Sequence, residues 1–233
     1  MSHTVVPPPA RFDAGGDEPH GMPHDLYASY VERLRRLVRV LGRCPLGWQE
    51  SARAGLGPDD IIQYWFAGIT LAASVPPQVR GQLDADLALS RRDLETAAAA
   101  AVPVIVSPLS HCYLDVPYAE APAGHAQADR HGRLGLRLYA PTTVAESEPV
   151  DVLGPGREAQ VAGVEAAIWA ETISGFDDLC FLLLPRLPGI ADKAWSAPQL
   201  ASWAGYRDRL ARHGRLWAQD DLTYFRTSTV DWL

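Results

Sequence analysis

Hydrophobic residues recur along this chain at helical spacing in some segments and cluster in short strand-like runs in others. These segments alternate, so the pattern predicts alternating helices and strands. A first amphipathic helix is predicted over 24–41, where apolar residues recur at steps of three and four and Gly42 ends the pattern. Its apolar stripe consists of Leu26, Tyr30, Leu34, Leu37 and Leu41. Further helical patterns cover 79–101, 176–195 with breaks at Pro185 and Pro188, and 198–217.

Short runs rich in β-branched and aromatic residues separate these helices. They predict strands at 10–14, 46–49, 59–66, 102–107 and 161–170. Residues 116–158 are rich in Gly, Pro and charge and show little periodicity, which indicates a long loop. Alternating strands and helices are typical of an α/β fold built on a parallel sheet with outer helices.

The ends of these predicted strands carry the aromatic and acidic residues that stand out in the sequence. In a barrel of parallel strands, active residues follow the carboxyl ends of the strands. Such residues follow all five strands here: Asp17 and Glu18, Trp48 and Glu50, Trp65, Tyr113 and Asp115, and Trp169 and Glu171. We therefore expect these side chains to converge.

Composition narrows the classes of protein to consider. The 233 residues are 47% hydrophobic, enough for a sizeable core, and the formal charge of −7 argues against a nucleic-acid surface. Three widely spaced cysteines suggest neither a metal cluster nor a disulfide framework. No signal-peptide pattern and no membrane-length apolar run is seen, so the default expectation is a cytoplasmic chain.

The segment GGDE at 15–18 is the first candidate for chemistry. Two glycines permit a sharp bend, which turns Asp17 and Glu18 toward one cleft. A proton donor beside an anion is the arrangement that glycosidic bond cleavage uses. Taken alone, the segment fits an exposed acidic turn equally well.

Aromatic side chains supply the walls that such a site needs. Trp48, Trp65 and Trp169 have faces that stack on sugar rings and enclose an acetyl methyl group, although each fits a core position as well. Tyr113 is either a site hydroxyl or a packed aromatic, and Asp115 either a sugar ligand or a turn cap. Glu50 alone reads most simply as a surface ion.

Together the motifs resemble the catalytic domain of family 20 glycoside hydrolases, the β-N-acetylhexosaminidases. The matching pieces occur in the family's order: GGDE at 15–18, GWQE at 47–50, QYW at 63–65, SPLSHCYLD at 107–115, GVEAAIWAET at 163–172 and PRLPGIADKAWS at 185–196. The resemblance implies an incomplete TIM-type (β/α) barrel, roughly strands four to eight, over 12–233. A Pro-rich lead occupies 1–11.

The resemblance also implies a function, a retaining, substrate-assisted hydrolysis that removes a terminal N-acetylhexosamine from a glycan. Glu18 is then the general acid, Asp17 orients the 2-acetamido group that acts as nucleophile, and Tyr113 hydrogen-bonds the acetamido oxygen. The tryptophans 48, 65 and 169 enclose the sugar, and Asp115 and Glu171 hold its hydroxyls. Neither a metal ion nor an organic cofactor is implied.

Other interpretations stay open at this point. The family's barrel has strands one to three before the GGDE motif, and Asp13 stands where the family usually has His. A non-catalytic sugar-binding or oligomerising remnant, a fragment that lacks an N-terminal half, and a homo-oligomer remain alternatives. So does a structural fragment with no sugar site. The sequence does not choose between N-acetylglucosamine and N-acetylgalactosamine.

Overall fold

The computed structural model describes residues 10–146, 160–195 and 202–232, which fall into two compact units. One unit contains Met1–Phe66, Asp84–Val106 and Leu153–Gly163, and the other contains Ala67–Leu83, Ser107–Val152 and Val164–Leu233. The predicted lead over 1–11 lies largely outside the described residues, and the single domain over 12–233 stays a prediction.

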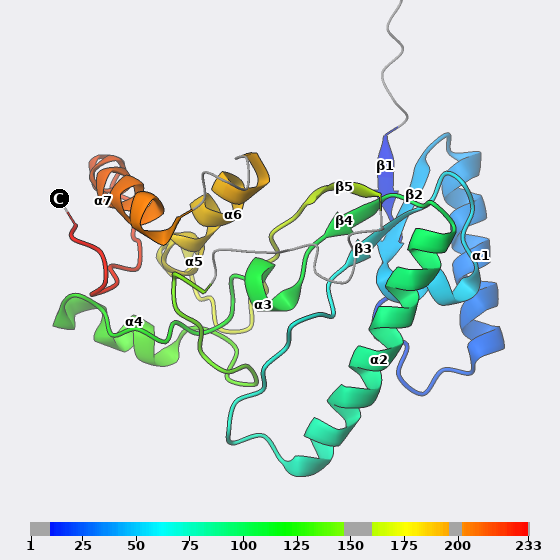
Figure 1. Ribbon diagram of the computed structural model, residues 1–233, viewed down its shortest axis with the longest axis horizontal. Coiled ribbons are helices and arrows are strands. Elements are labelled where there is room, and N and C mark those ends of the chain that lie inside the picture. Colours follow the sequence, from blue (N-terminus) through cyan, green and yellow to red (C-terminus); the bar gives the residue numbers. More distant parts are fainter. Residues whose placement is uncertain (1–9, 147–159, 196–201, 233) are drawn as a thin grey trace, which may run out of the picture. The chain divides into compact units, whose positions relative to one another are not determined.

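The first unit is built on a sheet with the strand order β1-β2-β3-β4-β5 (Figure 1). The pairings of β1 with β2, β2 with β3 and β3 with β4 are parallel, and β5 adjoins β4, where the N–H of Val104 donates to the carbonyl of Gln160 at 2.7 Å. The strands are β1 Arg11–Asp13, β2 Cys44–Trp48, β3 Ile61–Tyr64, β4 Val104–Val106 and β5 Val161–Val164. The predicted parallel α/β sheet is confirmed.

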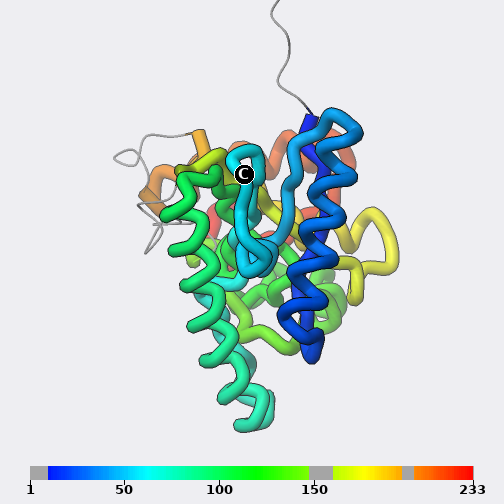
Figure 2. Tube along the Cα trace, turned by 90° about the vertical axis from the view of Figure 1, so that its right-hand side faces the viewer, coloured from blue at the N-terminus to red at the C-terminus, as the bar shows by residue number. Residues whose placement is uncertain are grey.

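Two long helices cover one side of this sheet (Figures 1 and 2). Helix α1, His24–Val40, connects β1 to β2, and α2, Pro77–Ala99, precedes β4. Successive parallel strands with right-handed crossovers bring their helices to the same face. Between β2 and β3 the chain forms a 3₁₀ helix instead, η1, Gln49–Ala54.

Helix α1 has the predicted extent, but the prediction of its buried face is wrong. The expected apolar stripe is largely exposed; Leu26, Tyr30, Leu37 and Leu41 are all more than half exposed. The buried residues lie one position later along the helix: Tyr27, Val31, Arg35 and Val38. Arg35 is tolerated inside because its guanidinium donates to the carbonyl of Ser51 at 2.8 Å and pairs with Asp60 at 3.3 Å.

The second unit is mostly helical around an aromatic core. Its elements are α3 Leu109–Cys112, η2 His125–Gln127, α4 Ala128–Arg133, α5 Phe176–Leu183, α6 Arg186–Trp195 and α7 Trp203–Gln219. Tyr118, Phe181 and Phe225 pack at the core centre, with the rings of Tyr118 and Phe225 stacked at 4.0 Å. The predicted long loop over 116–158 is thus interrupted by two short helices, η2 and α4.

Two proline predictions have different outcomes. Pro185 separates α5 from α6 as expected, but Pro188 lies inside the first turn of α6, where its missing N–H breaks no helical hydrogen bond. The last helix begins at Trp203, after Ser202 caps it by accepting the N–H of Gly205 at 3.2 Å. The predicted start at Pro198 lies outside the described residues.

The turn after β1 passes very close to β2, and we expect this contact to require glycine at position 47. An added Cβ there would lie 2.9 Å from Ser51 Oγ and 3.1 Å from the carbonyl oxygen of Gly15. We therefore predict that Gly47→Ala lowers the free energy of unfolding by about 1–3 kcal/mol, measured by urea denaturation.

Gly132→Ala is the matched control for this substitution. Gly132 lies in α4 with open space around its Cα, so alanine there should be neutral or stabilising by up to about 1 kcal/mol. Equal stability of the Gly47→Ala variant and the unmodified chain would contradict the close contact.

Candidate active site

The GGDE motif forms a sharp turn directly after β1. Gly15 and Gly16 have φ values of 66° and 97°, the left-handed region that favours glycine. The carbonyl of Gly15 accepts the N–H of Trp48 at 3.1 Å, and the carbonyl of Gly16 accepts the hydroxyl of Tyr27 at 2.6 Å. The predicted bend at these glycines is confirmed, and β2 and α1 both hold it in place.

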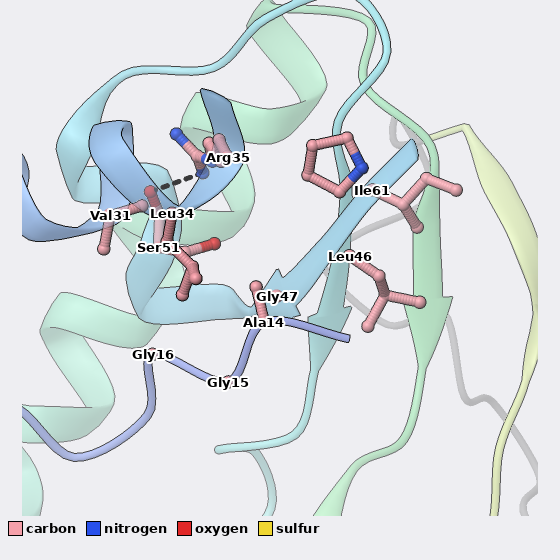
Figure 3. A pocket seen from close by; sticks show the side chains of 11 residues that line it. Ala14, Gly15, Gly16, Val31, Leu34, Arg35, Leu46, Gly47, Ser51 and Ile61 are labelled. Atoms are coloured by element: carbon pink, nitrogen blue, oxygen red, sulfur yellow. Dashed lines mark hydrogen bonds between the residues drawn. The ribbon is translucent and has the colours of Figure 1, made fainter. Parts of the chain in front are cut away.

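A small cavity lies beneath this turn (Figure 3). It has a volume of about 10 Å³ and is bounded by Gly15, Gly16, Leu46 and Ser51 together with the buried face of α1. A sugar site needs a pocket of several hundred Å³, so this space is a packing defect of at most one water molecule. The close packing around it fixes the backbone that leads into Asp17.

The two candidate carboxylates follow at the surface of the first unit. Asp17 and Glu18 are exposed, and the side chain of Glu18 is 58% exposed, with its carboxylate 4.0 Å from the ring of His20. Glu18 itself has a φ of 46°, which is rare for a residue with a side chain. Its backbone N–H donates to the carboxylate of Glu50 at 3.4 Å.

Glu50 lies between this turn and the two tryptophans of the first unit. Its carboxylate is 5% exposed and accepts the indole N–H of Trp65 at 3.2 and 3.3 Å. Trp65 in turn meets Trp48 edge to face, with ring centroids 5.9 Å apart. Burial raises the pKa of Glu50, and the hydrogen bonds from Trp65 and from the backbone of Glu18 oppose that rise.

Two predictions about the GWQE motif are therefore corrected. The predicted strand over 46–49 ends one residue early, because β2 ends at Trp48 and η1 begins at the next residue. Glu50 is also not a surface ion. The tight 3₁₀ turn directs it inward, toward Trp65.

Gln49 is a residue whose importance the sequence analysis missed. It is fully buried, and its side-chain oxygen accepts the backbone N–H groups of Trp65 and Phe66, both at 2.9 Å. Gln49 and Glu50 thus fix the backbone and the indole of Trp65 respectively. The sequence did offer a signal: Gln49 and Glu50 are two polar residues directly after a buried strand, and polar groups buried there need hydrogen-bond partners.

The second unit brings Tyr113 and Trp169 together. Their rings meet edge to face at 6.0 Å, with Tyr113 5% and Trp169 41% exposed. A parallel bridge beside them joins Tyr113 to Ala167, with the N–H of Leu114 donating to Ala167 at 2.8 Å. This bridge places Trp169 next to the phenol.

The predicted strand over 161–170 is too long. Strand β5 ends at Val164, and the next carbonyl, that of Glu165, accepts the Ser107 hydroxyl at 2.8 Å rather than a neighbouring strand's N–H. Pro108 follows on the other side and has no N–H with which to continue the ladder. Trp169 and Glu171 therefore lie on a loop beyond the strand, not at its end.

Asp115 is the most unusual carboxylate of the second unit. It is 1% exposed, and within the described residues neither oxygen meets the geometry of a hydrogen bond, although the backbone N–H groups of Asp115 and Trp169 lie close enough to lower its pKa. Burial, assisted by the negative charge of Glu171, raises the pKa of Asp115 to about 6. Glu171 itself is exposed. The Asp115 carboxylate has acceptor capacity that these N–H groups do not fill, so it is suited to receive hydroxyl groups of a ligand.

The remaining chemistry of the described residues is limited. In the ranges 10–146, 160–195 and 202–232, no group of three or more His, Cys, Asp or Glu could hold a metal ion. Within the same ranges, every helix is too short or too polar to cross a membrane. The eight candidate residues form two groups, one in each unit.

We expect Asp115 to make stability depend on pH. Its pKa rises from 3.8 to about 6 on folding, so the folded state retains the proton longer, and stability falls as pH rises from about 4 to about 6. Asp115→Asn removes this ionisation. It should raise the free energy of unfolding by about 1–3 kcal/mol at pH 8 and leave it nearly unchanged at pH 4.

Urea denaturation at the two pH values measures this difference. Asp129→Asn is the control, because Asp129 is 92% exposed and its replacement should change stability by no more than about 0.5 kcal/mol at either pH. A destabilised Asp115→Asn variant at pH 8 would show that the carboxylate has partners in the folded chain.

The chain is similar to known proteins over most of its length. A β-N-acetylhexosaminidase from Cellulomonas fimi is 32% identical over 221 residues, which are 94% of this chain and 38% of the relative. The solved GH20 β-N-acetylhexosaminidase from Streptomyces coelicolor A3(2) superposes with a TM-score of 0.75 at 28% identity, covering 95% of this chain and 40% of that chain. The chain thus spans about two fifths of these relatives' length.

A second solved structure gives the same result. The Streptomyces plicatus N-acetyl-β-hexosaminidase, in complex with Thio-NAglucal, superposes with a TM-score of 0.76 at 27% identity over 96% of this chain and 40% of that chain. The family model "Glycosyl hydrolase family 20, catalytic domain" matches residues 16–198. The parallel sheet with outer helices corresponds to part of that family's TIM barrel. The chain therefore belongs to glycosyl hydrolase family 20.

Proposed function

We propose that this chain carries the hydrolytic centre of a β-N-acetylhexosaminidase, which removes a terminal N-acetylhexosamine from a glycan. The observation that carries the proposal is the GGDE turn, which β2 and α1 fix and which presents Asp17 and Glu18 at the surface beside the Glu50–Trp65 contact. The relatives named above are hexosaminidases, and the chain spans about 40% of their length.

The proposed reaction uses the substrate's own 2-acetamido group as nucleophile. Its carbonyl oxygen attacks the anomeric carbon while Glu18 protonates the leaving oxygen, so the glycosidic bond breaks and a cyclic oxazolinium forms. Glu18, now a carboxylate, then takes a proton from the water that opens this ring, and configuration is retained. Asp17 accepts the acetamido N–H and offsets the positive charge.

The other candidate residues are assigned to binding. Tyr113 donates its hydroxyl to the acetamido oxygen, and Trp48, Trp65 and Trp169 provide apolar walls. Asp115 and Glu171 accept sugar hydroxyls. This assignment is supported by the unfilled acceptor capacity of the Asp115 carboxylate and by the partial exposure of Trp169, since both leave room for contacts with a ligand.

Replacing Glu18 tests the proposal. We expect Glu18→Gln to lower kcat for a chromogenic N-acetylglucosaminide by at least about 10³-fold, because the amide can neither protonate the leaving oxygen nor activate water. Glu32→Gln makes the same change of charge on the exposed face of α1 and should leave kcat unchanged. Full activity in Glu18→Gln would refute the assignment.

A second candidate function, sugar binding without turnover, is favoured by the exposure of Glu18. A general acid works best where water is excluded, whereas this side chain is 58% exposed. This function predicts that N-acetylglucosamine or its thiazoline analogue binds in a calorimetric titration while the chromogenic substrate stays intact. Turnover by the unmodified chain would exclude it, and absence of binding would exclude both functions.

The cellular setting belongs to the same set of proposals. A cytoplasmic location and a homo-oligomer stay predictions from the sequence, and the choice between gluco and galacto substrates is left open by it. Sedimentation of the purified chain and a comparison of kcat/KM for the two chromogenic sugars would decide the last two.

A further inference from the structure

The buried carboxylate of Glu50 contacts two candidate site residues at once. Oε1 accepts the backbone N–H of Glu18 at 3.4 Å, and Oε1 and Oε2 lie 3.3 and 3.2 Å from the indole nitrogen of Trp65. The three residues come from three different segments: the turn after β1, the start of η1, and the end of β3. Glu50 thus links parts of the chain that are far apart in sequence.

The positive charge of Arg53 has only a minor influence on the pKa of Glu50 and does not account for the burial of its carboxylate. In the described part of the chain no ion pair includes it, and the neighbouring Arg53 forms a bidentate pair with Asp93, at 2.7 to 3.1 Å. A buried carboxylate held only by neutral N–H donors costs stability. Burial raises the pKa of Glu50, and a carboxylate whose pKa rises on folding lowers the stability of the folded state once it is ionised.

The contact with Glu18 falls where the backbone needs support. Glu18 has a φ of 46°, and a residue with a side chain adopts this conformation only when its surroundings impose it. Without Glu50, the N–H of Glu18 would lose this acceptor, and the indole of Trp65 would lose the contact that fixes its orientation. The direction in which Glu18 leaves the turn would then be less well defined.

We propose that Glu50 is a positioning residue, whose carboxylate holds the backbone of Glu18 and the indole of Trp65 in the geometry that hydrolysis requires. This role deepens the proposed function and rests on it. Glu50 does not touch the substrate. It acts through the general acid and through one wall of the site, and that requirement explains a buried anion which stability alone does not favour.

Two substitutions at position 50 test this role. Glu50→Leu removes both acceptor oxygens while keeping a similar volume, and we expect kcat to fall about 10- to 100-fold, since small displacements of a catalytic group have effects of that size. Glu50→Gln keeps one acceptor oxygen, which is able to receive both N–H groups, and should retain kcat within about threefold. Both variants are measured at pH 7.5 on the full chain.

Stability separates positioning from a merely structural role. Glu50→Gln should unfold at an equal or higher urea concentration than the unmodified chain, because it removes a buried charge. Asp93→Asn is the matched control: its carboxylate is equally buried but paired with Arg53, so this variant should lose stability without a selective loss of kcat. A fall in kcat for Glu50→Leu that merely follows its loss of folded protein would overturn the proposal.

A readout without turnover keeps this test separate from that of the proposed function. The indole N–H signal of Trp65, assigned by its loss in Trp65→Phe, should be protected from hydrogen exchange in the unmodified chain and in Glu50→Gln, and unprotected in Glu50→Leu. If the unmodified chain neither hydrolyses nor binds the sugar, the proposed function fails, and the positioning role fails with it. If the chain is active, unchanged kcat or an unchanged indole signal in Glu50→Leu refutes the role of Glu50 alone.

Discussion

The close contact between the turn after β1 and the end of β2 is the constraint on which the first unit depends. Gly47 leaves room for the carbonyl of Gly15, and that carbonyl accepts the N–H of Trp48. Because this hydrogen bond holds the turn in place, the backbone N–H of Glu18 is able to donate to the carboxylate of Glu50. The absence of a side chain at Gly47 therefore helps to fix the position of the backbone that carries Glu18, the candidate acid.

Buried polar groups in this chain fall into two kinds, and the difference separates folding from function. Arg35 is buried with its guanidinium hydrogen-bonded, and the side-chain oxygen of Gln49 accepts two backbone N–H groups, although its Nε2 has no partner among the described residues. Among the described residues, Asp115 is buried with acceptor capacity unfilled, and Glu50 is buried with no ion pair of its own. Groups of the second kind lower stability, and they lie beside the residues proposed to act on the sugar.

Much of the fold could be predicted from the sequence, because the period of the hydrophobic residues indicates the helices and strands and the glycines indicate the turns. The order of strands, the extent of α1 and the bend at Gly15–Gly16 all follow from local pattern. The buried face of α1 could not be predicted, since counting apolar residues ignores a paired arginine such as Arg35. The end of β5 was also missed, because it depends on the Ser107 hydroxyl, a contact between segments distant in sequence.

The candidate site likewise contains some side chains that the sequence could identify and others that it could not. Residue type was enough to name Trp65 and Tyr113 as candidates, because a large aromatic after a buried strand fits either a binding surface or the core. It was not enough for Gln49 and Glu50, because their direction depends on the chain turning into η1 immediately after Trp48. The 3₁₀ turn directs the Glu50 carboxylate inward, so its contacts with the candidate residues Glu18 and Trp65 depend on one change of backbone conformation that no residue pattern predicts.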